Sequence, residues 1–228
     1  MNPNVLRITE TPMLVREQAF DRLHDAIITG HFAPGDRLIE RELCEAMGIS
    51  RTSIREVLRR LEAERLVEVE PRRGPTVARI NRKQAVEIYE MRAQLEAKLI
   101  ERFTKEATDE EIAQLCAIYE EIPRAAEAED VRELISIMTR FIGHVMQVVD
   151  HEIISDILRQ LVARISFLRA LSMSTPGRIN RSIDEIGAIV DAVVRRDPQA
   201  VVRYVKIYVN NACEAALKRL NEISAEDC

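Results

Sequence analysis

The chain has 228 residues and a formal net charge of −5, with 46% hydrophobic and 31% charged residues, seven glycines and no tryptophan. This length exceeds one typical domain of about 100–150 residues, and the composition is typical of a helical globular protein, so we expect two mainly α-helical domains. The sequence contains no apolar run of about 18 or more residues, which excludes an ordinary membrane-spanning helix.

The first predicted helix carries an apolar stripe and ends at a glycine. Phe20, Leu23 and Ile27 recur at helical spacing, and the pattern stops at Gly30. A turn with adjacent proline and glycine follows at residues 33–36.

Two further helices follow, joined by a short turn. The first spans residues 40–47 and breaks at Gly48, and the second begins after Ser50, whose hydroxyl can accept from the backbone N–H groups of the next turn. The apolar face of the second helix consists of Ile54, Val57, Leu58 and Leu61. This arrangement predicts a helix-turn-helix, in which the second helix enters the major groove of double-stranded DNA.

A hairpin is predicted next. Residues 66–70 alternate apolar and charged side chains, residues 71–75 form a basic turn, and residues 76–80 form a returning strand. Three helices followed by this hairpin predict a winged helix-turn-helix over residues 1–80. The same periodicity also fits two helices of an ordinary bundle, and a solvated helix face accounts for Arg59, Arg60 and Arg65 without any ligand.

Residues 81–228 are predicted to be entirely helical. The patterns indicate six helices: residues 82–106, a helix that starts with a capping box at Thr108, residues 131–149, a helix with its apolar face between Ile154 and Leu168, residues 181–196, and a last helix opened by Asp197-Pro198. Pro176-Gly177 separates the fourth helix from the fifth. Six antiparallel helices of these lengths predict a compact all-α bundle.

Short motifs in the first predicted domain resemble those of a known family. They are Gly30, Pro34-Gly35, Leu38, Glu40, Leu43, Met47-Gly48, Ser50-Arg51, Arg55-Glu56, Leu58, Leu61 and Gly74. With them, residues 27–77 resemble the DNA-binding domain of the GntR family of bacterial transcription regulators. The chain departs from the family at Arg65, where a glycine usually ends the recognition helix in a left-handed conformation.

The resemblance implies a set of DNA-contacting residues on the recognition helix, the helix before it and the wing. These are Arg41, Ser50, Arg51, Thr52, Ser53, Arg55, Arg72, Arg73 and Gly74. Arg51 or Arg55 would form a bidentate hydrogen bond with guanine, a contact that contributes roughly 1–3 kcal/mol of discrimination against other bases. The hydroxyls and the other arginines would bind phosphates or the minor groove. Residues 1–80 contain 13 arginines and 13 acidic residues, so their net charge is zero and non-specific binding to DNA should be modest. We therefore expect specific affinity to depend on a homodimer that engages both halves of an inverted repeat.

The second predicted domain resembles the FCD domain of the FadR-type branch of these regulators, in its VanR-like group. The resemblance rests on helix order and on the fragments Tyr89-Glu90-Met91-Arg92, Leu95-Glu96 and Arg196-Asp197-Pro198. Many FCD domains hold a divalent metal with one aspartate and three histidines. Those positions align with Met138, Ile142, Ile186 and Tyr208, of which the first three cannot ligate such a cation. We therefore expect no metal cofactor.

An effector pocket is expected in the helical domain. Its candidate residues are Arg92, Met138, Arg140, Ile142, Arg164, Ile186, Tyr208 and Asn211. Inward arginines would anchor a carboxylate or phosphate, whereas the apolar residues would favour an apolar ligand such as an acyl chain. A relocated metal site is a further alternative, formed by His144 and His151 with Asp150 or Asp156, if one helix continues through both histidines.

These observations predict a cytoplasmic, homodimeric DNA-binding transcription regulator, a repressor under the control of a small organic effector. The N-terminus lacks the pattern of a signal peptide, and the four cysteines lack metal-site spacing, which indicates reduced thiols. No phosphate loop, nucleophile elbow or other catalytic signature occurs, so we do not expect an enzyme. The alternative is a constitutive DNA-binding protein whose helical domain only dimerises.

Overall fold

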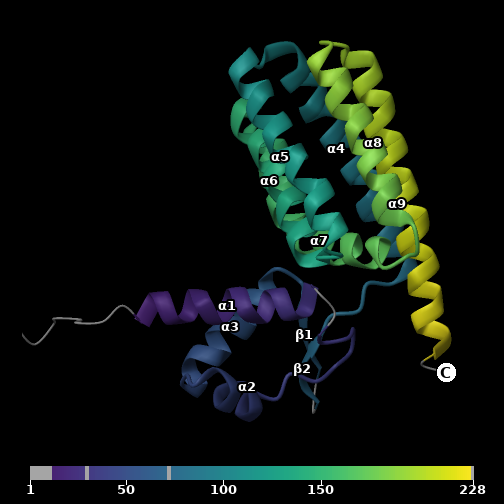
Figure 1. The fold of residues 1–228 in the computed structure, drawn as a ribbon. Coiled ribbons are helices and arrows are strands. Elements are labelled where there is room, and N and C mark those ends of the chain that lie inside the picture. Colours follow the sequence, from purple (N-terminus) through teal and green to yellow (C-terminus); the bar gives the residue numbers. More distant parts are fainter. Residues whose placement is uncertain (1–11, 29–30, 71–72, 227–228) are drawn as a thin grey trace, which may run out of the picture. The chain divides into compact units, whose positions relative to one another are not determined.

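The structure is a computed structural model that describes residues 12–28, 31–70 and 73–226 (Figure 1). Its internal contacts divide it into two units, Met1–Arg79 and Ile80–Cys228. The first unit is a winged helix-turn-helix and the second is a bundle of helices, which confirms the predicted fold class.

Three helices and a hairpin build the first unit. In chain order they are α1 (Pro12–Ile28), α2 (Glu40–Met47), α3 (Arg51–Ala63), β1 (Val67–Glu70) and β2 (Gly74–Val77). The apolar stripe predicted on α1 is buried, since Leu23 and Ile27 have no exposed surface. It packs against α3, whose Ile54 and Leu61 are likewise fully buried. Helix α2 ends at Gly48, which adopts the left-handed conformation with φ of 66°.

The hairpin pairs β1 and β2 in antiparallel register, with Val67 opposite Val77 and Glu70 opposite Gly74. The returning strand was predicted at residues 76–80, and this was wrong by two to three residues. Gly74 begins β2 with φ of +86°, a backbone conformation that glycine adopts without steric cost. The predicted helix end at Gly30 and the wing residues Pro71 and Arg72 lie outside the described residues.

Helix α3 ends without the glycine that its family resemblance implies. Arg65 itself takes the left-handed conformation, with φ of 59°. Its N–H donates to Glu62 O at 2.9 Å, and the N–H of Leu66 donates to Leu61 O at 2.9 Å. These two hydrogen bonds form a Schellman motif, so the helix stops at the usual place although a side chain occupies the strained position.

Six helices build the second unit. They are α4 (Arg82–Glu106), α5 (Asp109–Glu127), α6 (Val131–Val149), α7 (Glu152–Met173), α8 (Arg178–Val194) and α9 (Pro198–Glu226). Helices α4 and α5 start with the capping boxes Asn81–Gln84 and Thr108–Glu111. Helix α8 begins three residues earlier than predicted, because Gly177 turns the chain with φ of 72°. None of the helices in the described residues is long and apolar enough to cross a membrane.

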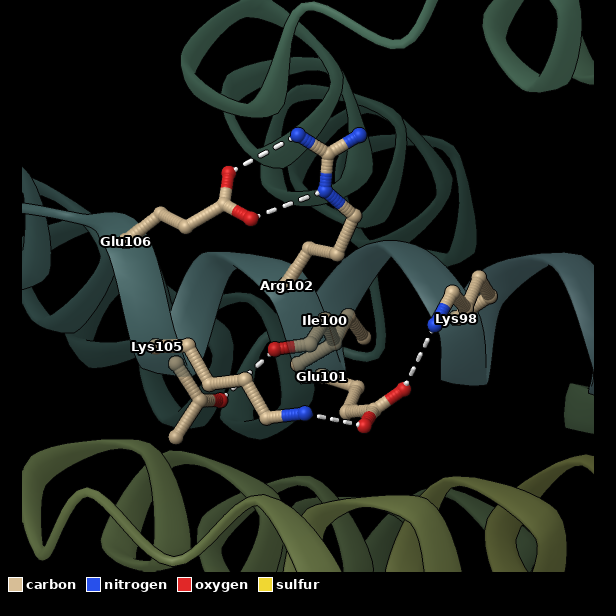
Figure 2. Close-up of polar contacts among 7 residues, drawn as sticks. Lys98, Ile100, Glu101, Arg102, Lys105 and Glu106 are labelled. Carbon is tan, nitrogen blue, oxygen red and sulfur yellow. Dashed lines mark hydrogen bonds and ion pairs between the residues drawn. The ribbon is translucent and has the colours of Figure 1, made fainter.

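Helix α4 contacts α6, α7, α8 and α9, and its longest contact is with α9 (Figure 1). Leu99 and Phe103 are fully buried on its inward side, as are Val201 and Val209 on α9. The outward side of α4 carries charged residues spaced three or four apart. In Figure 2, Glu101 lies between Lys98 and Lys105, and Arg102 pairs with Glu106. Such exposed pairs contribute little to stability, about 0.2–1 kcal/mol each.

Replacing Arg65 with glycine should stabilise the first unit. A left-handed conformation costs an L residue about 1–2 kcal/mol, part of which glycine loses again through its greater freedom in the unfolded chain. We expect Arg65→Gly to raise the free energy of unfolding by about 0.5–1 kcal/mol, measured by urea titration. The matched control is Arg59→Gly in the exposed middle of α3, which should lower it by about 1 kcal/mol. Equal losses in the two variants would contradict this account of the helix end.

Candidate functional site

The N-terminus of α3 presents polar groups away from the apolar core. Ser50 caps the helix: its Oγ accepts from the Ser53 N–H at 3.2 Å and lies 3.0 Å from Ser53 Oγ. Arg51 and Thr52 are exposed in the first turn. The first backbone N–H groups of a helix have no partner within the helix, and they attract anions such as phosphate. This end of α3 is therefore suited to a DNA backbone.

The candidate arginines of the helix-turn-helix differ in how firmly they are held. Arg55 Nε lies 3.0 Å from each carboxylate oxygen of Glu40, the first residue of α2, and this hydrogen bond and charge raise the pKa of Arg55. Arg41 lies 3.6 Å from Glu45. The Arg51 side chain has no ion-pair or hydrogen-bond partner within the described part of the chain. Of the two arginines expected to read a base, Arg51 is thus more readily available than Arg55.

The wing has one described arginine, Arg73, which is exposed at the start of β2 next to Gly74. Arg72, the other predicted wing contact, lies outside the described residues. Because Gly74 has no side chain, a DNA backbone can approach the hairpin end closely.

Helix α1 supports the back of α3. The Arg60 guanidinium lies 3.7 Å above the Phe20 ring, and its Nη1 is 2.8 Å from a Glu17 oxygen. A second ion pair joins Arg16 to Glu56. Arg60 is exposed, as expected of a solvated helix face, and its side chain also covers an aromatic ring of the neighbouring helix.

The second unit buries three charged side chains next to one another. Arg92 of α4 is 1% exposed, and its Nε donates to Glu96 Oε1 at 2.7 Å. Arg169 of α7 is 3% exposed, and its Nη2 lies 3.6 Å from the same Glu96 oxygen. We call Arg92, Glu96 and Arg169 the ionic cluster. One carboxylate serves two guanidinium groups, so the cluster carries an excess positive charge.

Hydrogen bonding within the ionic cluster is incomplete. Both terminal nitrogens of Arg92 and the Nε of Arg169 are buried without a hydrogen-bond partner. The Arg92 guanidinium instead lies between two aromatic rings, 5.8 Å from Tyr89 and 5.4 Å from Tyr208. Buried N–H donors without acceptors are costly, so this arrangement favours an additional anionic or acceptor group.

Burial and charge act differently on the two arginines. For Arg92, burial alone would lower the pKa, but the charge of Glu96 and the two tyrosines outweigh burial and raise the pKa above its ordinary value. For Arg169, burial and the positive charge of Arg92 lower the pKa. Glu96 lies 2.7 Å from Arg92 and 3.6 Å from Arg169, so Arg169 has the more distant counter-charge.

A small cavity of about 10 Å³ lies beside the ionic cluster, lined in part by Glu96 and Arg169. Met138, Ile142, Ile186 and Tyr208 also line it. The four positions that align with the family's metal ligands thus come together in space. A thioether, two hydrocarbon chains and a phenol do not form the nitrogen and carboxylate set that such a metal needs, so these residues do not fit the metal.

The remaining effector candidates lie elsewhere. Arg140 is exposed and pairs with Glu121 at 3.0 Å, so its predicted inward position is corrected to the outer surface of α6. Arg164 is half-buried on α7 and is not part of the cavity lining. Asn211 is exposed and donates to Glu185 at 2.7 Å.

The structure does not support the alternative metal site at His144 and His151. Helix α6 ends at Val149, and Asp150 adopts φ of 48°, so no single helix joins the two histidines. His144 Nε2 lies 2.8 Å from Glu111 O, and His151 caps α7. No cluster of three or more His, Cys, Asp or Glu side chains placed to hold a metal occurs within residues 12–28, 31–70 and 73–226.

Sequence reasoning missed Glu96 and Arg169 as site residues. Glu96 follows Arg92 by four positions, a spacing that places two side chains on one helix face. Arg169 stands alone in the apolar run Phe167-Leu168-Arg169-Ala170-Leu171. A single charge within such a run is the signal that could have identified it.

Removing the negative charge from the ionic cluster should destabilise the second unit strongly. Glu96→Gln leaves two buried guanidinium groups without a counter-charge, and we expect a loss of about 3–5 kcal/mol in the free energy of unfolding, measured with urea. The matched control is Glu101→Gln on the exposed side of the same helix (Figure 2), where the loss should stay below about 1 kcal/mol. Similar losses in the two variants would show that the cluster charges are not desolvated.

Comparison with known proteins supports both units separately. Residues 15–77 match the model of bacterial regulatory proteins of the gntR family, and residues 87–211 match the FCD domain. The regulator YdhC of Bacillus subtilis is 29% identical over 199 residues, which cover 86% of this chain and 88% of YdhC. The gluconate operon transcriptional repressor of the same organism is 27% identical over 165 residues, covering 72% of this chain and 67% of the repressor.

Solved structures share the fold. The Escherichia coli protein McbR/YncC superposes with a TM-score of 0.73 at 23% identity, covering 86% of this chain and 93% of McbR. A GntR regulator of Rhodococcus gives the same TM-score at 22% identity, covering 89% and 97% of the two chains. Since the matched domains account for both units of the fold, the chain belongs to the GntR family and is a transcription regulator with an FCD domain.

Proposed function

We propose that this regulator is a homodimeric repressor that binds an inverted-repeat operator and responds to a small organic anion in its helical unit. The observation that carries the effector proposal is the ionic cluster, which combines excess positive charge with unpartnered N–H donors beside a cavity. Similarity to the gluconate operon repressor supports the repressor role. Because a twofold-symmetric dimer presents two identical winged helix-turn-helix units, the matching operator is an inverted repeat.

In the proposed DNA complex, Arg51 reads a guanine, while the N-terminal turn of α3 holds the adjacent phosphate. Arg55 uses Nε for Glu40, so its terminal nitrogens remain available for a second base or for a phosphate. Ser50 keeps its capping role, and Thr52 and Ser53 offer hydroxyls. Arg41 and the wing arginines bind phosphates of the DNA backbone.

The proposed effector is a small carboxylate or phosphate with a short apolar body. Its anionic group would accept from Arg169, which lines the cavity, without a metal, and its apolar part would contact Met138, Ile142 and Ile186. Arg92 does not line the cavity and would contribute its charge through the ionic cluster. The cavity is only large enough for about one water molecule, so side chains must move to admit the effector. An effector that binds the conformation with an enlarged cavity more tightly increases the population of that conformation. DNA affinity then changes if this conformation and the effector-free conformation bind the operator unequally.

Replacing Arg51 with alanine should weaken specific DNA binding strongly without unfolding the protein. We expect operator affinity to fall by about tenfold to a hundredfold, because a bidentate arginine–guanine contact is lost. The measurement is a fluorescence-anisotropy titration against DNA from the gene's own upstream region at fixed salt, with random DNA for comparison. Arg59→Ala, two turns further along the exposed face of α3, is the control and should stay within about threefold.

The same titration separates the alternatives. Equal operator affinity in wild type and Arg51→Ala would reject the proposed docking of α3. Specific binding that no anion or apolar ligand changes would favour a constitutive DNA-binding protein. A response to fatty acyl compounds but not to short carboxylates would replace the anionic effector with an apolar one.

Chelation of divalent metal should leave both DNA binding and the effector response unchanged. The side chains at the family's metal positions are Met138, Ile142, Ile186 and Tyr208, which supply no suitable ligand set. We expect less than about 0.1 metal ion per chain by elemental analysis and the same anisotropy curves after EDTA treatment. Stoichiometric zinc or nickel in the purified protein would contradict this prediction.

A further inference from the structure

A second cavity lies in the helical unit, apart from the one beside the ionic cluster. It has a volume of about 330 Å³ and is formed by the α7–α8 turn, the first two turns of α8 and the facing part of α9. Its volume is at the lower end of the range of about 300–1,000 Å³ for small-molecule sites. The charged residues that line it are Arg178, Arg181, Glu185, Glu214 and Lys218.

Arg178 is the buried polar group of this cavity. It is 4% exposed, its Nη2 lies 2.8 Å from Glu185 Oε2, and the same nitrogen is 3.4 Å from Tyr208 O. Its Nε and Nη1 are buried and have no hydrogen-bond partner. Glu185 Oε2 is also buried without a hydrogen-bond partner, so its contact with Arg178 is an ion pair rather than an aligned hydrogen bond. Nε and Nη1 of Arg178 lack an acceptor, which is costly for a charged group in the interior.

The charges around the cavity indicate what the missing acceptor is. Three cations and two carboxylates line it, and one of the carboxylates, Glu185, is already held by Arg178 and by Asn211 Nδ2 at 2.7 Å. Arg181 and Lys218 are exposed at the solvent side. An anion that enters from solvent would meet these two cations first and then the free donors of Arg178.

We propose that this cavity is a second binding site, which takes a small organic anion with a carboxylate or phosphate group. The anion accepts from Nε and Nη1 of Arg178, and Arg181 and Lys218 neutralise its charge. The site lies outside the ionic cluster, and the side chains that would contact the anion are not those of the proposed effector site.

Tyr208 links this site to the ionic cluster. Its ring lies 5.7 Å from the Arg178 guanidinium and 5.4 Å from the Arg92 guanidinium. An anion on Arg178 weakens the positive field at a ring that also lies near Arg92. Occupancy of the two sites is thereby coupled through one side chain.

The test is isothermal titration of the metal-free full-length chain with succinate and, separately, with inorganic phosphate at constant ionic strength. We expect saturable binding that weakens by about tenfold in Arg181→Gln and in Lys218→Gln, since each removes one charge-assisted contact. Arg178→Gln should abolish binding. The control is Arg195→Gln at the other, exposed end of α8, which should bind as wild type does.

The outcomes separate this site from the ionic cluster. Because Arg178→Gln can fail to fold, the exposed double variant Arg181→Gln/Lys218→Gln serves as the second test, and wild-type binding in it overturns the proposal. Binding that disappears in Arg169→Gln but persists in the double variant assigns the anion to the ionic cluster instead. Preference for succinate over phosphate, or the reverse, identifies the anionic group that the cavity takes. No saturable heat with either anion also overturns it.

Discussion

Two guanidinium groups that share one carboxylate determine how the helical bundle of this regulator can pack. Arg92 and Arg169 extend from α4 and α7 to Glu96, so the contact between these helices depends on a balance of charge as well as on apolar burial. The surrounding tyrosines supply partial compensation, since Tyr89 and Tyr208 present their rings to Arg92. Burying these cations costs desolvation free energy, and a ligand with a negative charge would offset part of it.

The ionic cluster also lies beside the four positions that align with the family's metal ligands. At the four positions aligned with the family's metal ligands, Met138, Ile142 and Ile186 bring no charge, and Tyr208 contributes an aromatic ring. The positive charge next to these positions belongs to Arg92 of α4 and Arg169 of α7. A guanidinium binds carboxylates through a planar pair of donors, so recognition would rest on hydrogen-bond geometry rather than on coordination.

The sequence predicted most helix ends because the signals are local. Asn81 with Gln84, and Thr108 with Glu111, form capping boxes within four residues, and α4 and α6 have the predicted bounds. Which arginines face inward could not be predicted in the same way. Arg92 and Arg140 have the same chemistry, and only the fold places Glu96 beside the first in the interior and Glu121 beside the second at the surface. The contacts to DNA remain predictions, although the exposed first turn of α3 is compatible with them.

The placement of Tyr208 also has a spectroscopic consequence. The chain contains four tyrosines and no tryptophan. Two of these tyrosines, Tyr89 and Tyr208, are buried near Arg92, and Tyr208 also lies near Arg178. Half of the tyrosines of the protein therefore lie near buried guanidinium groups. The circular dichroism and emission of the unlabelled chain consequently act as an intrinsic reporter of what happens to the charges inside the bundle.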